Sequence, residues 1–379
     1  MRYPPISLYI HIPWCEKKCP YCDFNSYASS KIPEKDYVDC LIADLQLEAE
    51  HLRGRELESI FIGGGTPSLF STEALGKLLK EVAESLYLKP DIEVTLEVNP
   101  ASADAKKFLG FVRAGINRLS IGVQSFSDTS LLYLGRIHSG RDSASTIKLA
   151  QASGFSNINI DLMYGLPNQS EDEALADLVE AVSREPQHIS WYELTIEPNT
   201  MFHSNPPNLP DEDILEAIQE SGLNFLYTKG FYRYEISAFS STEHQCKHNL
   251  NYWRFGDYLG IGAGAHSKIT NDDGSITRYS KTRKPEDYLS ARPCAIRVKE
   301  SILSRKETVL DFVLNAFRLT DGFTLDQFKK STYLNPRHLE PEISLLCNQG
   351  LVLKNSMGYK TTPLGQRYLN EVIHKFMLN

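Results

Sequence analysis

The sequence predicts an α/β protein with a mostly parallel sheet in its first two-thirds and a small α+β domain at its C-terminus. Two observations predict this fold class. Apolar runs of strand length alternate with amphipathic segments of helix length, and polar or reactive residues follow the ends of several apolar runs. Alternation of strands and helices at this spacing is typical of parallel strands joined by right-handed crossovers.

Six apolar runs are expected to form strands, and a weaker seventh follows them. The six are Leu8–Ile12, Ser59–Gly63, Glu93–Val98, Arg118–Val123, Asn157–Leu162 and Ile189–Leu194, and the seventh is Tyr234–Phe239. The segments between them are expected to be helices, namely Glu34–Leu52, Thr72–Ser85, Asp104–Ala114, Arg141–Ser153, Glu171–Ser183 and Asp211–Lys229. Ser71, Ser102 and Ser170 are the expected N-caps of three of these helices.

These patterns divide the chain into a sheet domain over residues 1–240, a connecting region over 241–300 and a C-terminal domain over 301–379. The connecting region is expected to be irregular because four glycines lie close together at positions 256, 260, 262 and 264. In the tail, Thr308–Phe317, His338–Asn348 and Leu364–Phe376 have helical patterns, and residues 351–353 and 359–361 flank a turn. This order resembles a winged-helix module.

Composition excludes several classes of protein. The net charge of −8 argues against a general nucleic-acid surface, and no apolar stretch is long enough to span a bilayer. The N-terminus has no signal-peptide hydrophobic region. Seven cysteines, three of them in one motif, fit a reducing cytoplasm. We therefore expect a cytoplasmic protein whose other cysteines, Cys40, Cys246, Cys294 and Cys347, are packed residues.

The most informative motif is the spacing C-x3-C-x2-C formed by Cys15, Cys19 and Cys22, directly after the first strand. Three thiolates on one loop are able to hold three irons of a [4Fe–4S] cluster and to leave the fourth iron open, whereas electron-transfer clusters normally have four protein ligands. A zinc site with His11 is an alternative, although no second C-x2-C pair is present. Buried unreactive cysteines are disfavoured because residues 16–18 are all charged.

Polar residues at the ends of other predicted strands are expected to converge on the edge that carries the cysteines. They are Gly63, Gly64, Gly65, Thr66, Glu97, Asn99, Gln124, Arg136 and Asp161. The triple glycine either lets a ligand approach the backbone or forms a tight turn. Glu97 and Asp161 lie between apolar residues and need a cationic partner if buried, either a bound ligand or an arginine such as Arg118 or Arg136.

A second motif, His248-Asn249-Leu250-Asn251-Tyr252-Trp253, combines a candidate iron ligand with two aromatic rings able to stack on a flat macrocycle. Taken alone, His248 is more readily explained as a structural histidine. His11, His138 and His266 are rival candidates for metal binding or acid–base chemistry.

Together these motifs resemble those of the oxygen-independent coproporphyrinogen III oxidase (HemN-like) family of radical S-adenosylmethionine (SAM) proteins. The resemblance covers nearly the whole chain and implies an incomplete, TIM-like (βα)6 barrel with a C-terminal accessory domain. It implies that Cys15, Cys19 and Cys22 bind a [4Fe–4S] cluster that reduces SAM to a 5′-deoxyadenosyl radical. The residues implied to contact SAM are Tyr9, Tyr21, Gly64, Gly65, Thr66, Glu97, Gln124, Arg136 and Asp161.

Two departures from the oxidase favour a heme-chaperone branch of this family. Phe24 stands where the oxidase has a fourth cysteine, and only eight residues precede Tyr9, where the oxidase has a longer segment that helps to cover its active site. The chaperone branch shares both features and carries the His-Asn-x-x-Tyr-Trp motif, which makes His248 the implied heme ligand. Cys246 and covalent attachment remain alternatives for holding heme.

The resemblance thus implies a cytoplasmic heme chaperone that binds a [4Fe–4S] cluster, SAM and heme, and passes heme to respiratory hemoproteins at the membrane. The alternative is a coproporphyrinogen III oxidase of heme biosynthesis. A nucleic-acid-modifying enzyme acting through the C-terminal domain is disfavoured by the acidic charge. The heme acceptor, the oligomeric state and the fate of SAM are open at this stage.

Overall fold

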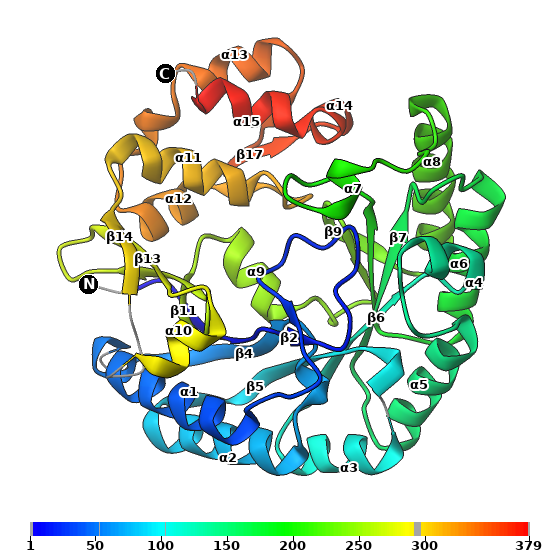
Figure 1. The fold of residues 1–379 in the computed structure, drawn as a ribbon. Helices are drawn as coiled ribbons and strands as arrows, with labels where there is room; N and C mark the ends of the chain where they lie inside the picture. Colours follow the sequence, from blue (N-terminus) through cyan, green and yellow to red (C-terminus); the bar gives the residue numbers. More distant parts are fainter. Residues whose placement is uncertain (1–2, 53, 103, 292–296, 378–379) are drawn as a thin grey trace.

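The computed structural model describes residues 3–52, 54–102, 104–291 and 297–377 (Figure 1). A 12-stranded sheet forms its larger part, and the middle of this sheet is parallel in the order β11-β1-β4-β5-β6-β7-β8. These strands are β1 (Ile6–Ile12), β4 (Glu56–Gly64), β5 (Tyr87–Val98), β6 (Arg118–Gln124), β7 (Ile158–Tyr164), β8 (His188–Glu193) and β11 (Asp257–Ile261). The predicted α/β class with a mostly parallel sheet is confirmed.

Antiparallel strands extend both edges of this parallel sheet. β10 (Ala238–Ser240) and β9 (Tyr232–Glu235) follow β8, and β12 (His266–Thr270), β13 (Ile276–Lys281) and β14 (Arg297–Ile302) follow β11. The single strand predicted over residues 234–239 is therefore wrong, because this segment reverses direction and forms a hairpin. The hairpin returns β10 to pair antiparallel with β8.

The prediction of an irregular region over residues 241–300 is also wrong. It contributes four strands and two helices, α9 (Lys247–Trp253) and α10 (Pro285–Ser290), in the residues that the structure describes. Its glycines permit close packing and do not break the sheet. A Cβ atom on Gly260 would lie 2.2 Å from the His266 carbonyl oxygen, and one on Gly262 would lie 2.4 Å from the His11 carbonyl oxygen. The described residues of this region, 241–291 and 297–300, are thus part of the sheet domain.

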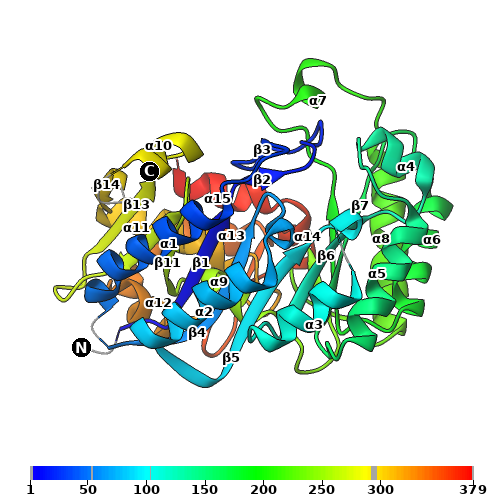
Figure 2. The ribbon, with the colours of Figure 1, turned by 60° about the horizontal axis from the view of Figure 1, so that its bottom comes forward.

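Helices surround the outer face of the parallel strands, so the domain has the form of an open barrel (Figures 1 and 2). They are α1 (Glu34–Ala49), α2 (Thr72–Ser85), α3 (Ala105–Arg113), α4 (Asp128–Tyr133), α5 (Gly140–Ala152), α6 (Glu171–Ser183) and α8 (Glu212–Thr228). The short helix α7 (Met201–Ser204) lies instead beyond the sheet edge, where the Phe202 amide donates to the Pro20 carbonyl of the cysteine loop (Figure 2). Ser71 and Ser170 are N-caps as predicted. Ser102 is not, because its hydroxyl bonds to the Asn99 carbonyl and Asp104 caps α3 instead.

The main core lies between the sheet and these helices and contains alternate residues of the central strands, for example Ile10, Ile62 and Leu96. One buried ion cluster crosses it. Lys281 of β13 donates to Asp44 at 2.6 Å and to Glu48 at 2.5 Å, and all three side chains are almost fully buried. This cluster ties an edge strand of the sheet to α1.

The C-terminal domain has the winged-helix order predicted for it, with a helix and a strand that the sequence did not reveal. It comprises α11 (Arg305–Ala316), β15 (Phe323–Thr324), α12 (Leu325–Thr332), α13 (Glu342–Asn348), β16 (Val352–Lys354), β17 (Gly358–Thr361), α14 (Pro363–Arg367) and α15 (Leu369–Met377). Its three strands pair in the order β15-β17-β16. Phe255, which follows α9, packs into the core of this domain and joins it to the barrel.

The remaining structural predictions concern cysteines and membrane spans. Cys40 and Cys246 are buried, Cys347 is half-buried, and Cys294 lies outside the described residues. In the described part of the chain, no helix has both the length and the apolar character needed to cross a bilayer.

Candidate functional site

The three motif cysteines lie on a loop at the carboxyl end of β1. The loop begins and ends in a short parallel pair, β2 (Trp14–Cys15) and β3 (Tyr27–Ala28), which lies above the sheet edge in Figure 2. Lys18 closes the loop by donating to the carbonyl oxygens of Phe24 and Ser26, each at 3.1 Å. Cys15, Cys19 and Cys22 are half-buried and line one cavity, so all three thiols face the same space.

The protein environment alone does not favour the thiolate form of Cys15 or Cys22. Burial raises the pKa of Cys15, and it also raises the pKa of Cys22 although Ser26 and the Phe24 backbone oppose the shift. A bound metal deprotonates a coordinating thiol outright. The three cysteines could therefore hold an iron cluster, and the iron would supply the charge that makes them thiolates.

His11 is not positioned as a fourth metal ligand. Its Nδ1 atom is hydrogen-bonded to the Tyr9 hydroxyl at 2.9 Å, and its Nε2 atom to the Asn25 carbonyl oxygen at 2.9 Å. Burial lowers its pKa to about 4, so the ring is neutral at pH 7. Because both nitrogens bind within the chain, His11 supports the cysteine loop and the zinc alternative lacks its fourth ligand.

The cavity has a volume of about 740 Å³, within the range of ligand pockets. It extends from the cysteine loop across the carboxyl ends of β4 to β8. Of the residues singled out in the sequence as SAM contacts, it brings together Tyr21, Gly64, Gly65, Thr66, Glu97, Gln124, Arg136 and Asp161. Phe24, which replaces the fourth cysteine of the oxidase, lies at the same cavity and is 59 % exposed.

The triple glycine is packed tightly against the cysteine loop. The Gly65 amide donates to the Ile12 carbonyl at 2.7 Å, and a Cβ atom on Gly65 would lie 2.4 Å from the Trp14 carbonyl oxygen. Gly64 has φ +118°, and a Cβ atom there would lie 2.6 Å from the His11 ring. These glycines therefore let β4 support the cysteine loop at backbone contact distance.

Glu97 and Asp161 are half-buried residues whose carboxyl groups line the cavity. Glu97 accepts from the Gly64 amide at 3.0 Å, while Asp161 accepts from Ser120 at 3.0 Å and from Asn159 at 2.8 Å. Burial and the neighbouring charge of Asp161 raise the pKa of Glu97 to about 7, against the opposing Gly64 hydrogen bond. Burial also raises the pKa of Asp161. The site thus disfavours two negative charges unless a cation joins them.

The arginines considered as partners for these carboxylates have other contacts. Arg118 lies 4.0 Å from Glu93, and Arg136 donates to the Gly122 carbonyl at 2.8 Å and to Cys19 Sγ at 3.6 Å. Arg136 is therefore beside the cysteines, where an anionic group of a cluster ligand would need a cation. The Glu97 and Asp161 carboxyls remain available for a cationic ligand.

Tyr9 and His248 do not line the cavity in the described structure. His248 lies on α9, inside the barrel against β1, β4 and β11 (Figure 1), and is 2 % exposed. Its Nδ1 atom is hydrogen-bonded to Ser59 at 2.9 Å and its Nε2 atom to Tyr252 at 3.2 Å, while its ring stacks on Phe61. Burial and the charge of Arg118 lower its pKa to about 3. His248 is thus neutral but has no free nitrogen in this conformation.

Comparison with known proteins gives the family. Residues 9–181 match the Radical SAM superfamily. The chain is 47 % identical over 381 residues to the heme chaperone HemW of Haemophilus influenzae, which covers 99 % of both chains. The chain belongs to the HemW family. HemW of Escherichia coli is 45 % identical over 378 residues, covering 100 % of this chain and 99 % of that protein.

The resemblance extends to a mitochondrial protein and to a solved structure. A radical S-adenosyl methionine domain-containing protein of Bos taurus is 38 % identical over 97 % of this chain and 86 % of its own. The structure of coproporphyrinogen III oxidase HemN of Escherichia coli superposes with a TM-score of 0.84 over 99 % of this chain and 90 % of that one, at 22 % identity. This likeness confirms the predicted radical SAM fold, and the sequence likeness places the chain among the HemW proteins.

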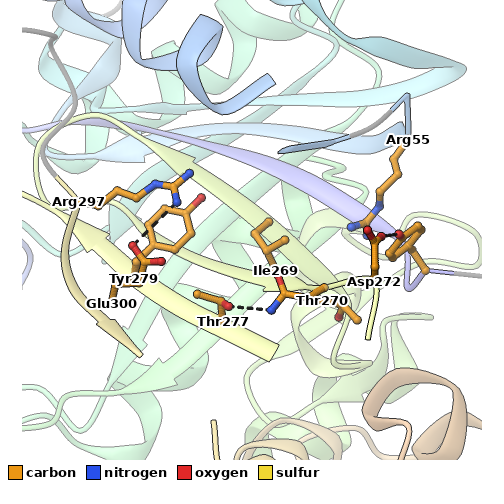
Figure 3. A pocket seen from close by; sticks show the side chains of 10 residues that line it. Arg55, Ile269, Thr270, Asp272, Thr277, Tyr279, Arg297 and Glu300 are labelled. Atoms are coloured by element: carbon orange, nitrogen blue, oxygen red, sulfur yellow. Dashed lines mark hydrogen bonds and ion pairs between the residues drawn. The ribbon is translucent and has the colours of Figure 1, made fainter. Parts of the chain in front are cut away.

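A second cavity, of about 220 Å³, lies near β12, β13 and Tyr3 (Figure 3). Its charged side chains already have partners. Arg55 pairs with Asp257 at 2.9 Å, Arg297 pairs with Glu48 at 2.7 Å, and the Tyr3 hydroxyl bonds to Asp272. We therefore place the functional site in the larger cavity, where the cysteines and the unpaired carboxyls meet.

Sequence reasoning missed several residues that line this larger cavity, among them Tyr192, Glu193 and Glu235 of the sheet and Arg318 of the C-terminal domain. Arg318, which follows α11 in the C-terminal domain, lines it together with Trp253 and Asn249 of α9. No local motif marks Arg318, because its position depends on how the two domains pack. Asn249 and Trp253 belong to the same motif as His248. These two residues line the cavity, whereas His248 is buried and does not.

Proposed function

We propose that this HemW-family chain is a cytoplasmic heme chaperone that binds a [4Fe–4S] cluster, SAM and heme, and delivers heme to respiratory hemoproteins. The observation that carries the proposal is the meeting, in one cavity, of three half-buried thiols with the half-buried carboxyls of Glu97 and Asp161, which form no salt bridge within the described residues. Sequence identity of 45–47 % to proteins named heme chaperones supports the heme part.

Cys15, Cys19 and Cys22 would hold the cluster, whose open iron would bind SAM and supply one electron to it. Arg136, beside Cys19, would bind the SAM carboxylate with its forked guanidinium. Glu97 and Asp161 would bind the cationic or hydroxyl-bearing parts of SAM. Tyr21, Gly64, Gly65, Thr66 and Gln124 would complete the pocket, and Tyr9 would act through its hydrogen bond to His11.

His248 is the proposed heme ligand, and this assignment demands a movement of the protein. An iron–imidazole bond needs one ring nitrogen, so binding must break the contact with Ser59 or the contact with Tyr252. The Tyr252 contact is the longer of the two at 3.2 Å, and Tyr252 lies one turn further along α9. We therefore expect Nε2 to be the nitrogen that binds iron.

A hemin titration of the anaerobically reconstituted protein, followed by Soret absorbance, tests this function. Saturable binding is expected for the parent chain and for His138→Ala, which removes a histidine that does not line the cavity. Weaker binding with an altered Soret maximum is expected for His248→Ala. Absence of saturable binding in the parent would contradict the heme function, and equal binding by both variants would move the ligand away from His248.

The oxidase alternative is tested on the same preparation. The chaperone function predicts that coproporphyrinogen III is not decarboxylated when SAM and a reductant are supplied. Turnover with release of carbon dioxide would favour the oxidase. Iron and sulfide analysis of a Cys19→Ala variant, compared with Cys347→Ala, tests whether the cluster depends on the motif cysteines.

A further inference from the structure

Arg318 is held at the cavity by contacts between the C-terminal domain and the barrel. The segment after α11 pairs with β9 through a bridge between Leu319 and Glu235, and the Thr320 amide donates to the Tyr234 carbonyl at 3.1 Å. The Thr320 hydroxyl adds a contact to the same carbonyl at 3.2 Å. Because the backbone on the C-terminal side of Arg318 is fixed in this way, the domain contributes a defined wall to the cavity.

The side chain of Arg318 lies over the Trp253 ring, with its guanidinium carbon 4.4 Å from the ring centroid. Its NH2 atom is 3.5 Å from a carboxylate oxygen of Glu235, which is too long for a strong hydrogen bond. Stacking on an indole holds the plane of a guanidinium while leaving its N–H edges able to bind an anion.

Buried polar atoms in this wall lack hydrogen-bond partners within the described structure. They are Arg318 Nε, Trp253 Nε1 and Glu235 Oε2. A buried donor or acceptor without a partner is destabilising by about 1–3 kcal/mol, so each such atom in a native site calls for an explanation, of which a bound water, ion or ligand is one. Two of the three are N–H donors, which indicates that the missing partner is an acceptor.

The local charge also favours an anion. Glu235 is shared between Arg318 and Arg233, and the Arg233 Nε atom already donates to the Glu235 and Ile236 carbonyls. Burial raises the pKa of Glu235, which weakens it further as a counter-ion. In the same cavity Arg136 lies beside Cys19 and is the proposed partner of the SAM carboxylate. Arg318 is thus a further cation of the cavity, contributed by the C-terminal domain, in addition to Lys17, Lys18, Arg118 and Arg136.

We propose that Arg318 and Trp253 form a second anion-binding position of the cavity, which takes a carboxylate carried on a flat ring system, namely a propionate of heme. The guanidinium and the indole N–H would donate to the carboxylate, and the neighbouring aromatic and apolar surface would contact the ring. This inference rests on the proposed heme function. It makes Arg318 the residue by which the C-terminal domain recognises the ligand.

Soret titrations with hemin and with its dimethyl ester, which lacks ionised propionates, test the inference on the full chain. The parent is expected to bind hemin more tightly than the ester. Arg318→Ala is expected to lose roughly 10- to 100-fold in hemin affinity and nothing for the ester, because a charged hydrogen-bonded pair is removed. Arg318→Lys keeps the charge without the fork and is expected to lie between. Arg254→Ala, an exposed arginine at the end of α9, is the matched control and should behave as the parent.

Glu235→Gln provides a readout of the opposite sign. It removes the carboxylate that competes for Arg318. The Gln amide oxygen is still able to accept the hydrogen bond that the Ser237 amide donates to Glu235 Oε1 at 3.2 Å in the parent chain. Hemin affinity should rise and ester affinity should not. A variant that merely damaged the fold would not tighten binding.

The outcomes separate this inference from the heme function itself. If the parent binds no hemin, both fail. If the parent binds hemin but Arg318→Ala and Arg318→Lys retain the full preference over the ester, or lose affinity for both ligands equally, the inference is overturned while the heme function stands. If either variant weakens SAM binding in equilibrium dialysis without changing hemin binding, the carboxylate bound at Arg318 belongs to SAM and the inference is likewise overturned.

Discussion

Replacing Glu97 by Gln is expected to stabilise the ligand-free protein at pH 8 while weakening its binding of SAM. The pKa of Glu97 is about 7 in the fold, against an ordinary value of 4.5. Between these values the unfolded chain loses the proton and the folded chain keeps it. Stability contributed by this group is therefore fully present below pH 4.5 and is lost as the pH rises through 7.

The magnitude follows from these two pKa values. Their difference of about 2.5, at 1.36 kcal/mol for each pH unit, corresponds to about 3 kcal/mol of lost stability at pH 8. Gln cannot ionise but can still accept from the Gly64 amide, which Glu97 does at 3.0 Å. The entropy of unfolding scales with chain length. For 379 residues that melt as one unit, a gain of about 3 kcal/mol therefore raises the Tm of Glu97→Gln at pH 8 by about 4 °C.

Thermal melting of the cluster-free protein at pH 5 and pH 8 measures this effect. Glu97→Gln should raise Tm at pH 8 and much less at pH 5, whereas Glu220→Gln, an exposed residue of α8, should change neither value. The reconstituted Glu97→Gln variant should bind SAM more weakly by equilibrium dialysis. Equal Tm values for variant and parent at pH 8 would show that the fold does not raise the pKa of Glu97.

Two further predictions concern the scaffold. Lys281→Met should lower the free energy of unfolding by about 3–5 kcal/mol, because it leaves Asp44 buried without its cation while Glu48 keeps only Arg297, and a denaturant titration measures this. Gly65→Ala should reduce the iron and sulfide bound after reconstitution, because the new methyl group would lie 2.4 Å from the Trp14 carbonyl oxygen and displace the cysteine loop. Gly76→Ala is the control, because Gly76 lies in α2 and its new methyl group would lie 3.8 Å from the Ala114 Cβ atom, an ordinary contact distance. This variant should load the cluster normally, and a similar loss would point to a general effect of adding a methyl group.

Local patterns predicted the central strands and most outer helices because each of these elements contains its own signal. The runs at residues 8–12 and 59–63 are apolar and end at polar or glycine-rich loops, and both are strands of the sheet. The convergence of the cysteine loop, Glu97 and Asp161 on one cavity followed from a general property of parallel sheets. It required no long-range information.

The errors occurred where long-range packing decides the structure. Glycines at 260 and 262 resembled a loop because their role, a close approach to the backbone at His266 and His11, involves distant or reversed segments. The motif around His248 left a structural role and a heme-binding role open, because it does not show that Ser59 and Phe61 surround the ring. Arg318 had no motif at all. Sequence patterns therefore indicated the part of the cavity formed by the cysteine loop and the strand ends better than the part formed by the C-terminal domain.

The position of β1 has a consequence for how the protein is made. The strand that leads into the cysteine loop pairs with β4 on one side and with β11, residues 257–261, on the other. During synthesis, when chains generally fold from the N-terminus, the first strand must wait for a partner made some 250 residues later. The loop can take its final form only when about two-thirds of the chain has left the ribosome, so we expect the cluster to be inserted after β11 has been made.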